Sequence, residues 1–148
     1  MAAIGFYHLT RTGPERALPQ LLSRTLAQSQ RAVVLCSGPE RLADLDAALW
    51  EAGEAWLPHN GPGGEDPDLQ PIWITTEDAP APNGARFLFL IDGAESTRIG
   101  DYERVFDLFD GRSEAATQAA RRRWAAAREA GHALTYWQQT ERGWRQNP

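Results

Sequence analysis

Residues 31–50, RAVVLCSGPERLADLDAALW, decide the fold class. Arg31–Cys36 is a short apolar run, and its length and composition are typical of a strand that is buried on both faces. From Pro39 onward the spacing changes, because Leu42, Leu45 and Leu49 recur at intervals of three and four residues and share one face of a helix. Pro39 is a favoured first helical residue, and we expect Ser37 to cap this helix. A buried strand followed by an amphipathic helix is the repeating unit of an α/β fold.

The same alternation continues on both sides of this stretch. Upstream, Ile4–Thr10 predicts a strand and residues from about Pro14 to Gln30 predict a helix. Downstream, an alanine-rich helix is predicted from its cap Ser113 to Gly131. Further strands are predicted at Trp56–His59, Pro71–Thr75, Arg86–Asp92, Tyr102–Phe109 and His132–Gln139. We therefore expect one α/β domain over residues 1–148, with three layers: a mixed, mostly parallel sheet with helices on both faces, in a Rossmann-like topology without a nucleotide site.

Composition excludes several classes of protein. The net charge of −5 argues against a general DNA-coating protein, because neutralising phosphates requires a basic surface. Every strong cation is arginine, so an anion site must use arginine, histidine or backbone N–H groups. Cys36 is the single cysteine, which excludes an intramolecular disulfide and favours a reducing cytoplasm. No apolar run has the length that crosses a bilayer, and the first residues do not read as a signal peptide, so we expect no contact with membranes.

No recognised catalytic or cofactor motif is found along the chain. The glycines at 61–64 lack the GK[ST] of a phosphate-binding loop, and the three histidines lack the spacing of metal ligands. Ser37 follows a strand without the GxSxG context of a nucleophile. We therefore expect no catalysis, cofactor or metal. The alternative is a small α/β enzyme that acts on a nucleotide-like or phosphorylated ligand at the carboxyl ends of the strands, near Ser37, Thr76 and Asp92.

One stripe of the alanine-rich helix carries functional side chains. At about 100° per residue, Thr117, Arg121, Trp124 and Arg128 share a narrow face. A tryptophan between two arginines is suited to anchoring an acidic peptide that has an apolar end. Two alternatives stay open: Trp124 packs under a neighbouring loop, or Arg121–Arg123 bind nucleic acid. A separate face is made of alanines, which suit close packing on a sheet: Ala116, Ala120, Ala127 and Ala130.

A second cluster contains large aromatic residues between the second helix and the predicted third strand. Trp50 and Trp56 lie close together in sequence, and Pro58 and His59 follow. Clustered tryptophans are either core residues or an apolar patch for a partner protein.

Several short motifs occur in an order that resembles a known family. They are FYHL at the first strand, ALW at residues 48–50, LPHN at 57–60, PIWIT at 71–75, FLFLID at 87–92, VFDLFD at 105–110 and R-x-x-W-x-x-x-R-x-A-G at 121–131. Together they resemble the chi subunit of bacterial DNA polymerase III over nearly the whole chain.

The resemblance implies an adaptor without catalysis. Such a subunit joins the clamp-loader assembly to single-stranded DNA-binding protein by gripping the acidic C-terminal tail of that protein, which ends in phenylalanine and a free carboxylate. DNA is then contacted only indirectly. Carried over by position, the tail site comprises Arg121, Trp124 and Arg128, with Thr117 and Gly131 nearby, and Arg128 is expected to meet the carboxylate.

The resemblance also implies a second surface, which faces a psi subunit or another clamp-loader subunit. Its expected residues are Trp50, Trp56, Pro58 and His59. The sequence departs from relatives that carry a lysine in place of Thr117 and a tyrosine in place of Trp124. We therefore expect weaker binding to the acidic residues of the tail.

Overall fold

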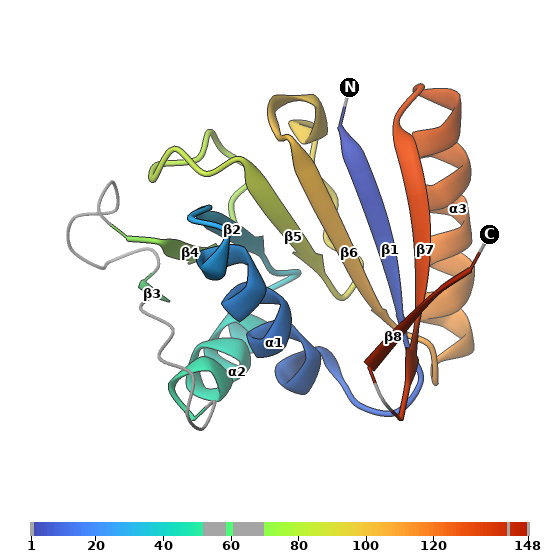
Figure 1. Cartoon of the computed structure of the whole chain (residues 1–148), viewed down its shortest axis with the longest axis horizontal. Coiled ribbons are helices and arrows are strands. Elements are labelled where there is room, and N and C mark those ends of the chain that lie inside the picture. Colours follow the sequence, from blue (N-terminus) through green and yellow to red (C-terminus); the bar gives the residue numbers. More distant parts are fainter. Residues whose placement is uncertain (1, 52–58, 61–69, 142, 148) are drawn as a thin grey trace.

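The structure is a computed structural model that describes residues 2–51, 59–60, 70–141 and 143–147. Within these residues the chain forms one sheet with helices on both of its faces (Figure 1). The helices are α1 (Pro14–Ala27), α2 (Pro39–Trp50), the short 3₁₀ helix η2 (Ile99–Asp101) and α3 (Glu114–Glu129). The strands are β1 (Ala3–Leu9), β2 (Ala32–Leu35), β3 (His59–Asn60), β4 (Ile72–Thr75), β5 (Phe87–Ile91), β6 (Arg104–Asp110), β7 (Ala133–Thr140) and β8 (Gly143–Asn147).

The described strands follow the spatial order β3-β4-β2-β5-β6-β1-β7-β8. Neighbouring strands pair in parallel except β7 and β8, which form an antiparallel hairpin. The chain starts in β1, the third described strand from one edge of the sheet, and crosses the positions of β6 and β5 to reach β2. It later returns through β5 and β6 to place β7 beside β1. The predicted three-layer α/β fold with a mixed, mostly parallel sheet is confirmed.

Two apolar layers cover the two faces of the sheet. In β1, Tyr7 and Leu9 point to the face that α1 and α2 cover, whereas Ile4 and Phe6 point to the face that α3 covers. This alternation follows from the period of two along a strand. Each of the central strands β2 and β5 is buried along its whole length, because helices or loops lie on both faces.

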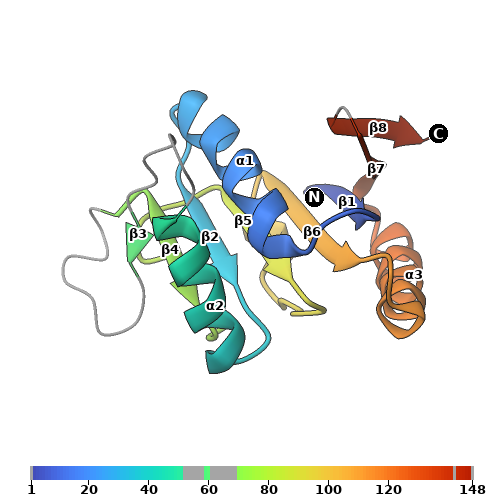
Figure 2. The same ribbon diagram turned by 90° about the horizontal axis from the view of Figure 1, so that it is seen from below.

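The β7–β8 hairpin bends toward the face of α1. Figure 2 shows β8 and α3 on opposite sides of β7. Trp144 of β8 packs edge-on against Tyr7, with ring centroids 5.0 Å apart. Trp137 of β7 stacks on the same tyrosine at 6.0 Å. Gly5 makes room for these rings, since a Cβ there would lie 2.9 Å from the ring of Tyr7.

Most predicted element positions are confirmed, and a few are corrected. Ser113 caps α3 as expected, because its Oγ accepts a hydrogen bond from the N–H of Ala116 at 3.2 Å. Ser37 does not cap α2: the capping position is Gly38, which has an extended backbone, and Pro39 sets the first turn. The hairpin strand β8 was not predicted, because five residues near a chain end carry too little periodicity.

The third predicted strand is only partly within the described residues. β3 covers His59 and Asn60, whereas Trp56 and Pro58 lie outside the described residues. In the described part of the chain, no helix is both long enough and apolar enough to span a bilayer.

Candidate functional site

Helix α3 lies across β1, β6 and β7 and is anchored by a buried ion pair. The guanidinium of Arg123 donates to both carboxylate oxygens of Asp107 in β6, at 2.7 and 2.9 Å. The side chain of Asp107 is 3% exposed and that of Arg123 is 12% exposed. A bidentate pair of this kind fixes both the height and the rotation of the helix on the sheet.

The C-terminal end of α3 is closed by Gly131. Its φ of +86° is left-handed, which favours glycine. The N–H of Gly131 donates to the carbonyl of Arg128, and the N–H of His132 donates to that of Ala127. These two bonds form a Schellman motif that ends the helix and turns the chain into β7.

With α3 held in this way, one edge of the helix borders a cavity of about 250 Å³, which we call the tryptophan pocket. Thr117, Ala120, Arg121 and Trp124 form the helix wall. The opposite wall comes from three strands: Phe6 and His8 of β1, Phe109 of β6 and Tyr136 of β7. Three residues of the predicted stripe are therefore brought together at one cavity.

Trp124 forms part of this wall with one side packed and the other accessible. Its ring meets that of Phe6 edge-on at 5.2 Å and that of Tyr136 edge-on at 6.2 Å. The tryptophan is half-buried, so it packs on strand residues rather than under a loop. An aromatic wall of this kind can receive an apolar side chain.

Polar groups lie along the opposite wall of the tryptophan pocket. His8 Nδ1 and the hydroxyl of Tyr136 form a hydrogen bond, and the His8 ring stacks on Phe109 with ring centroids 5.0 Å apart. Burial lowers the pKa of His8, a hydrogen bond with the Gly111 backbone acts in the opposite direction, and the nearby charge of Arg121 lowers the pKa further. Burial raises the pKa of Tyr136, and Arg121 acts against that rise. Arg121 is itself exposed, so an arriving anion can reach it.

Sequence reasoning missed His8, Phe109 and Tyr136. A signal was present in the FYHL and TYW stretches, because each places a polar aromatic within an apolar strand. Arg128 and Gly131 do not line the tryptophan pocket. Arg128 is exposed one turn beyond Trp124, on the same stripe.

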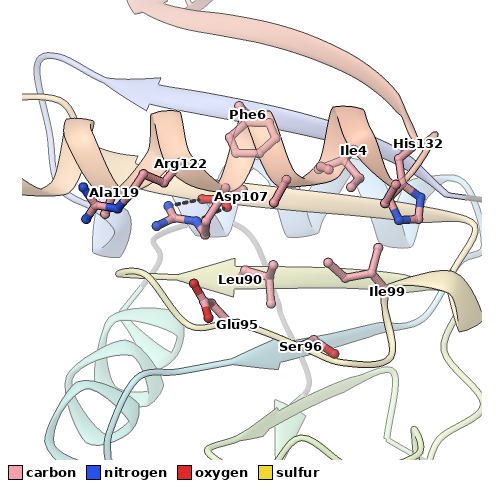
Figure 3. Close-up of a pocket in the computed structure, with 14 residues that line it drawn as sticks. Ile4, Phe6, Leu90, Glu95, Ser96, Ile99, Asp107, Ala119, Arg122 and His132 are labelled. Carbon is pink, nitrogen blue, oxygen red and sulfur yellow. Dashed lines mark hydrogen bonds and ion pairs between the residues drawn. The ribbon is translucent and has the colours of Figure 1, made fainter.

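The alanine face of α3 is less tightly packed than predicted. Ala120 is 3% exposed, but Ala116 and Ala127 are only half-buried and Ala130 is exposed. Part of this face borders a second cavity of about 510 Å³, on the other side of α3 (Figure 3). Leu90 and Ile99 lie across that cavity from Ile4 and Phe6. The α3 layer therefore leaves space beside the β5–β6 connection.

The second predicted surface is only partly described. α2 ends at Trp50, and β3, which starts at His59, pairs with β4 at the far end of the sheet from β7. Trp56 and Pro58 lie outside the described residues. The backbone therefore places both ends of this segment on one side of the molecule (Figure 1).

The residues considered for catalysis have structural partners or lie at the surface. The carboxylate of Asp92 accepts a hydrogen bond from Arg41, which also donates to Glu15 at 3.0 Å. Ser37 and Thr76 are exposed. Among the described residues, no three His, Cys, Asp or Glu side chains gather closely enough to hold a metal ion.

Comparison with known proteins agrees with the motif resemblance. No curated protein matches the chain. Residues 1–135 of the 148 match the family described as DNA polymerase III chi subunit, HolC. The match extends from β1 into β7 and contains the whole of α3, and the resemblance predicted from the ordered motifs is thereby confirmed. The chain belongs to the chi-subunit family of DNA polymerase III.

Proposed function

We propose that this subunit is a non-catalytic adaptor of the DNA polymerase III holoenzyme. It binds the acidic C-terminal tail of single-stranded DNA-binding protein and links that protein to the clamp loader during DNA replication in the cytoplasm. DNA is reached only through the bound protein. The observation that carries this proposal is the tryptophan pocket, where Trp124 and Arg121 stand side by side.

The terminal phenylalanine of the tail enters the pocket against Trp124 and Phe109. Its carboxylate pairs with Arg121, because this arginine lines the pocket whereas Arg128 does not. Such charge-assisted bonds are stronger than neutral ones. Arg128, one turn away on the same stripe, serves the acidic residues upstream. Thr117 is uncharged, and its hydroxyl already donates to the carbonyl of Ser113 at 2.9 Å.

Binding is expected to be modest and sensitive to salt. A short disordered peptide loses conformational freedom when it binds, so the Kd should be on the order of micromolar. Added salt should weaken it, because the arginines are exposed and screened. This modest affinity lets the contact form and break quickly during replication.

Calorimetry with the tail peptide tests this proposal. The intact peptide should bind, and a peptide without its terminal phenylalanine should not. A peptide with an amidated C-terminus separates the contribution of the carboxylate from that of the ring. Equal affinity for the intact and the truncated peptides would remove the support for this site.

The second surface, at Trp50, Trp56, Pro58 and His59, is proposed to dock a psi subunit or another clamp-loader subunit. Its support is the position of β3, which begins the strand order, while β7 beside the tryptophan pocket lies near the other end. Two partners can then bind at once. Trp56→Ala should weaken co-purification with the clamp-loader assembly by about 2 kcal/mol or more. Tail-peptide affinity serves as the control, because loss of both activities would indicate misfolding.

A further inference from the structure

One wall of the tryptophan pocket carries polar groups that binding of an apolar side chain alone would not need. His8 Nδ1 and the Tyr136 hydroxyl are in direct hydrogen-bond contact, and both residues line the pocket together with Arg121. The two residues are separated by 128 positions in sequence and meet because β1 and β7 pair. This contact suggests a role in selecting the charged end of the peptide.

The other edge of the His8 ring is held by the turn before α3. A Cβ at Gly111 would lie 1.9 Å from Cδ2 and 2.0 Å from Nε2 of His8, so the ring fills the space that this glycine leaves. A hydrogen bond to the Gly111 backbone acts on the same ring. In the neutral tautomer that carries its proton on Nε2, His8 presents Nδ1 as an acceptor, and Tyr136 donates its hydroxyl hydrogen to it.

This arrangement is poorly suited to a carboxylate as long as His8 is neutral. The Tyr136 oxygen then presents only lone pairs to the pocket, and a carboxylate also carries only acceptors. The situation reverses when Nδ1 carries a proton, since the imidazolium donates to the Tyr136 oxygen and frees the hydroxyl hydrogen to face the pocket. Among the described titratable and charged groups, Tyr136 from β7 and Arg121 from α3 are those that act on His8.

We propose that His8 and Tyr136 form a proton-coupled receptor for the free α-carboxylate of the bound peptide. When the carboxylate enters the tryptophan pocket, His8 takes up one proton from solvent at Nδ1 and donates it in a hydrogen bond to Tyr136, whose hydroxyl then donates to the carboxylate. No covalent bond other than that N–H forms or breaks. The inference rests on the proposed binding of the tail and goes beyond it by predicting a pH-dependent affinity.

Affinity rises or falls with pH according to whether the bound or the free protein holds the His8 proton more tightly. Burial lowers the pKa of His8 in the free protein and outweighs the hydrogen bond with the Gly111 backbone, which raises it, while Arg121 lowers it further. His8 is therefore neutral near pH 7. A bound carboxylate stabilises the imidazolium and raises this pKa. Affinity therefore increases as the pH falls through the interval between the bound and the free pKa. It stays constant above and below that interval.

The test is calorimetry of an N-acetylated tail peptide at pH 8.0 and pH 6.0, in pairs of buffers with different ionisation enthalpies. We expect the Kd to be about threefold or more lower at pH 6.0 than at pH 8.0, because the lower pH favours the imidazolium that the bound carboxylate stabilises. Net proton uptake should accompany binding. Both effects should disappear in Tyr136→Phe, which keeps the ring beside Trp124, and in His8→Gln.

A matched control is His132→Gln. His132 Nδ1 accepts the N–H of Ala2 at 3.1 Å, and it does not line the tryptophan pocket, so this variant should keep the pH dependence. If His8→Gln does not fold, Tyr136→Phe alone decides. A wild-type Kd that is equal at both pH values would overturn the inference and leave the proposed function intact. A pH dependence that persists in Tyr136→Phe, or with an amidated peptide, would also overturn the inference and leave the proposed function intact. Absence of any binding would overturn both.

Discussion

The guanidinium of Arg123 and the carboxylate of Asp107 join the middle of α3 to the middle of β6 through two hydrogen bonds, at 2.7 and 2.9 Å. This contact separates the roles of three successive arginines. Arg121 lines the tryptophan pocket and Arg122 lines the larger cavity on the other side of the helix. Because Arg123 is buried in the ion pair, it is not available to phosphates, which weakens the interpretation of Arg121–Arg123 as a nucleic-acid site.

Arg123→Ala should destabilise the protein strongly. It leaves the carboxylate of Asp107 buried without its partner, and breaking such a pair costs about 3–5 kcal/mol. Urea unfolding followed by circular dichroism measures the loss. Arg122→Ala is the matched control, because Arg122 is exposed and surface changes usually stay within about 0.5 kcal/mol. Equal stability of the two variants would contradict an anchoring role for the pair.

Arg121→Ala and Trp124→Ala should each weaken binding of the tail peptide by about 1–3 kcal/mol. The first removes the cation of the pocket and the second removes its aromatic wall. Arg122→Ala again serves as the control, since it removes an equal charge from the neighbouring position without touching the pocket. Arg128→Ala should have a smaller effect than Arg121→Ala. If calorimetry gives the opposite order, the carboxylate pairs with Arg128.

Gly111→Ala should impair the tryptophan pocket without changing any of its lining residues. The added methyl would overlap the His8 ring and lie 2.9 Å from the carbonyl oxygen of Leu9. Overpacking of this kind costs about 1–3 kcal/mol. We expect a lower melting temperature and a weaker affinity for the tail peptide. Gly38→Ala is a suitable control, because a Cβ there meets nothing within 4 Å, and it should leave peptide affinity unchanged.

Gly131→Ala should lower stability but leave the peptide site intact. A non-glycine residue at a φ of +86° costs about 1–2 kcal/mol. Gly131 does not line the tryptophan pocket, so tail affinity should stay within about twofold, a difference smaller than 1 kcal/mol. Gly100→Ala, where a Cβ meets open space, should be nearly neutral in thermal unfolding. A large loss of peptide affinity in Gly131→Ala would mean that Gly131 contacts the tail.

Asp78 should make stability depend on pH in the acid range. Burial alone would raise the pKa of Asp78, but hydrogen bonds from Ser96 and Thr97 outweigh it and lower the pKa. A carboxylate with a depressed pKa stabilises the fold above its unfolded pKa, and this contribution is lost as the pH falls through the folded value. Because Asp78 is exposed and solvent screens its interactions, Asp78→Ala should cost less than about 1 kcal/mol at pH 7, and less still at pH 3. Urea unfolding of the wild type and of Asp78→Ala at the two pH values measures this difference, and an equal cost at both would contradict the prediction.

Local patterns were sufficient to predict most elements, because the side-chain period of a helix or strand is a property of the backbone itself. The leucines of residues 39–50 and the cap at Ser113 are examples. The same reasoning failed at Ser37, where Gly38 and Pro39 set the start of the helix. It also missed β8, whose pairing with β7 depends on a hairpin contact.

The sequence by itself determined the fold class, the family and the helix wall of the tryptophan pocket, since Thr117, Arg121 and Trp124 share one face of a single helix. Only the tertiary structure decided what faces that wall. His8, Phe109 and Tyr136 come from three strands that are neighbours because of the strand order of the sheet. The periodicity of side chains along the sequence does not reveal that order. It also decided which arginine is buried, because Asp107, the partner of Arg123, lies on another element.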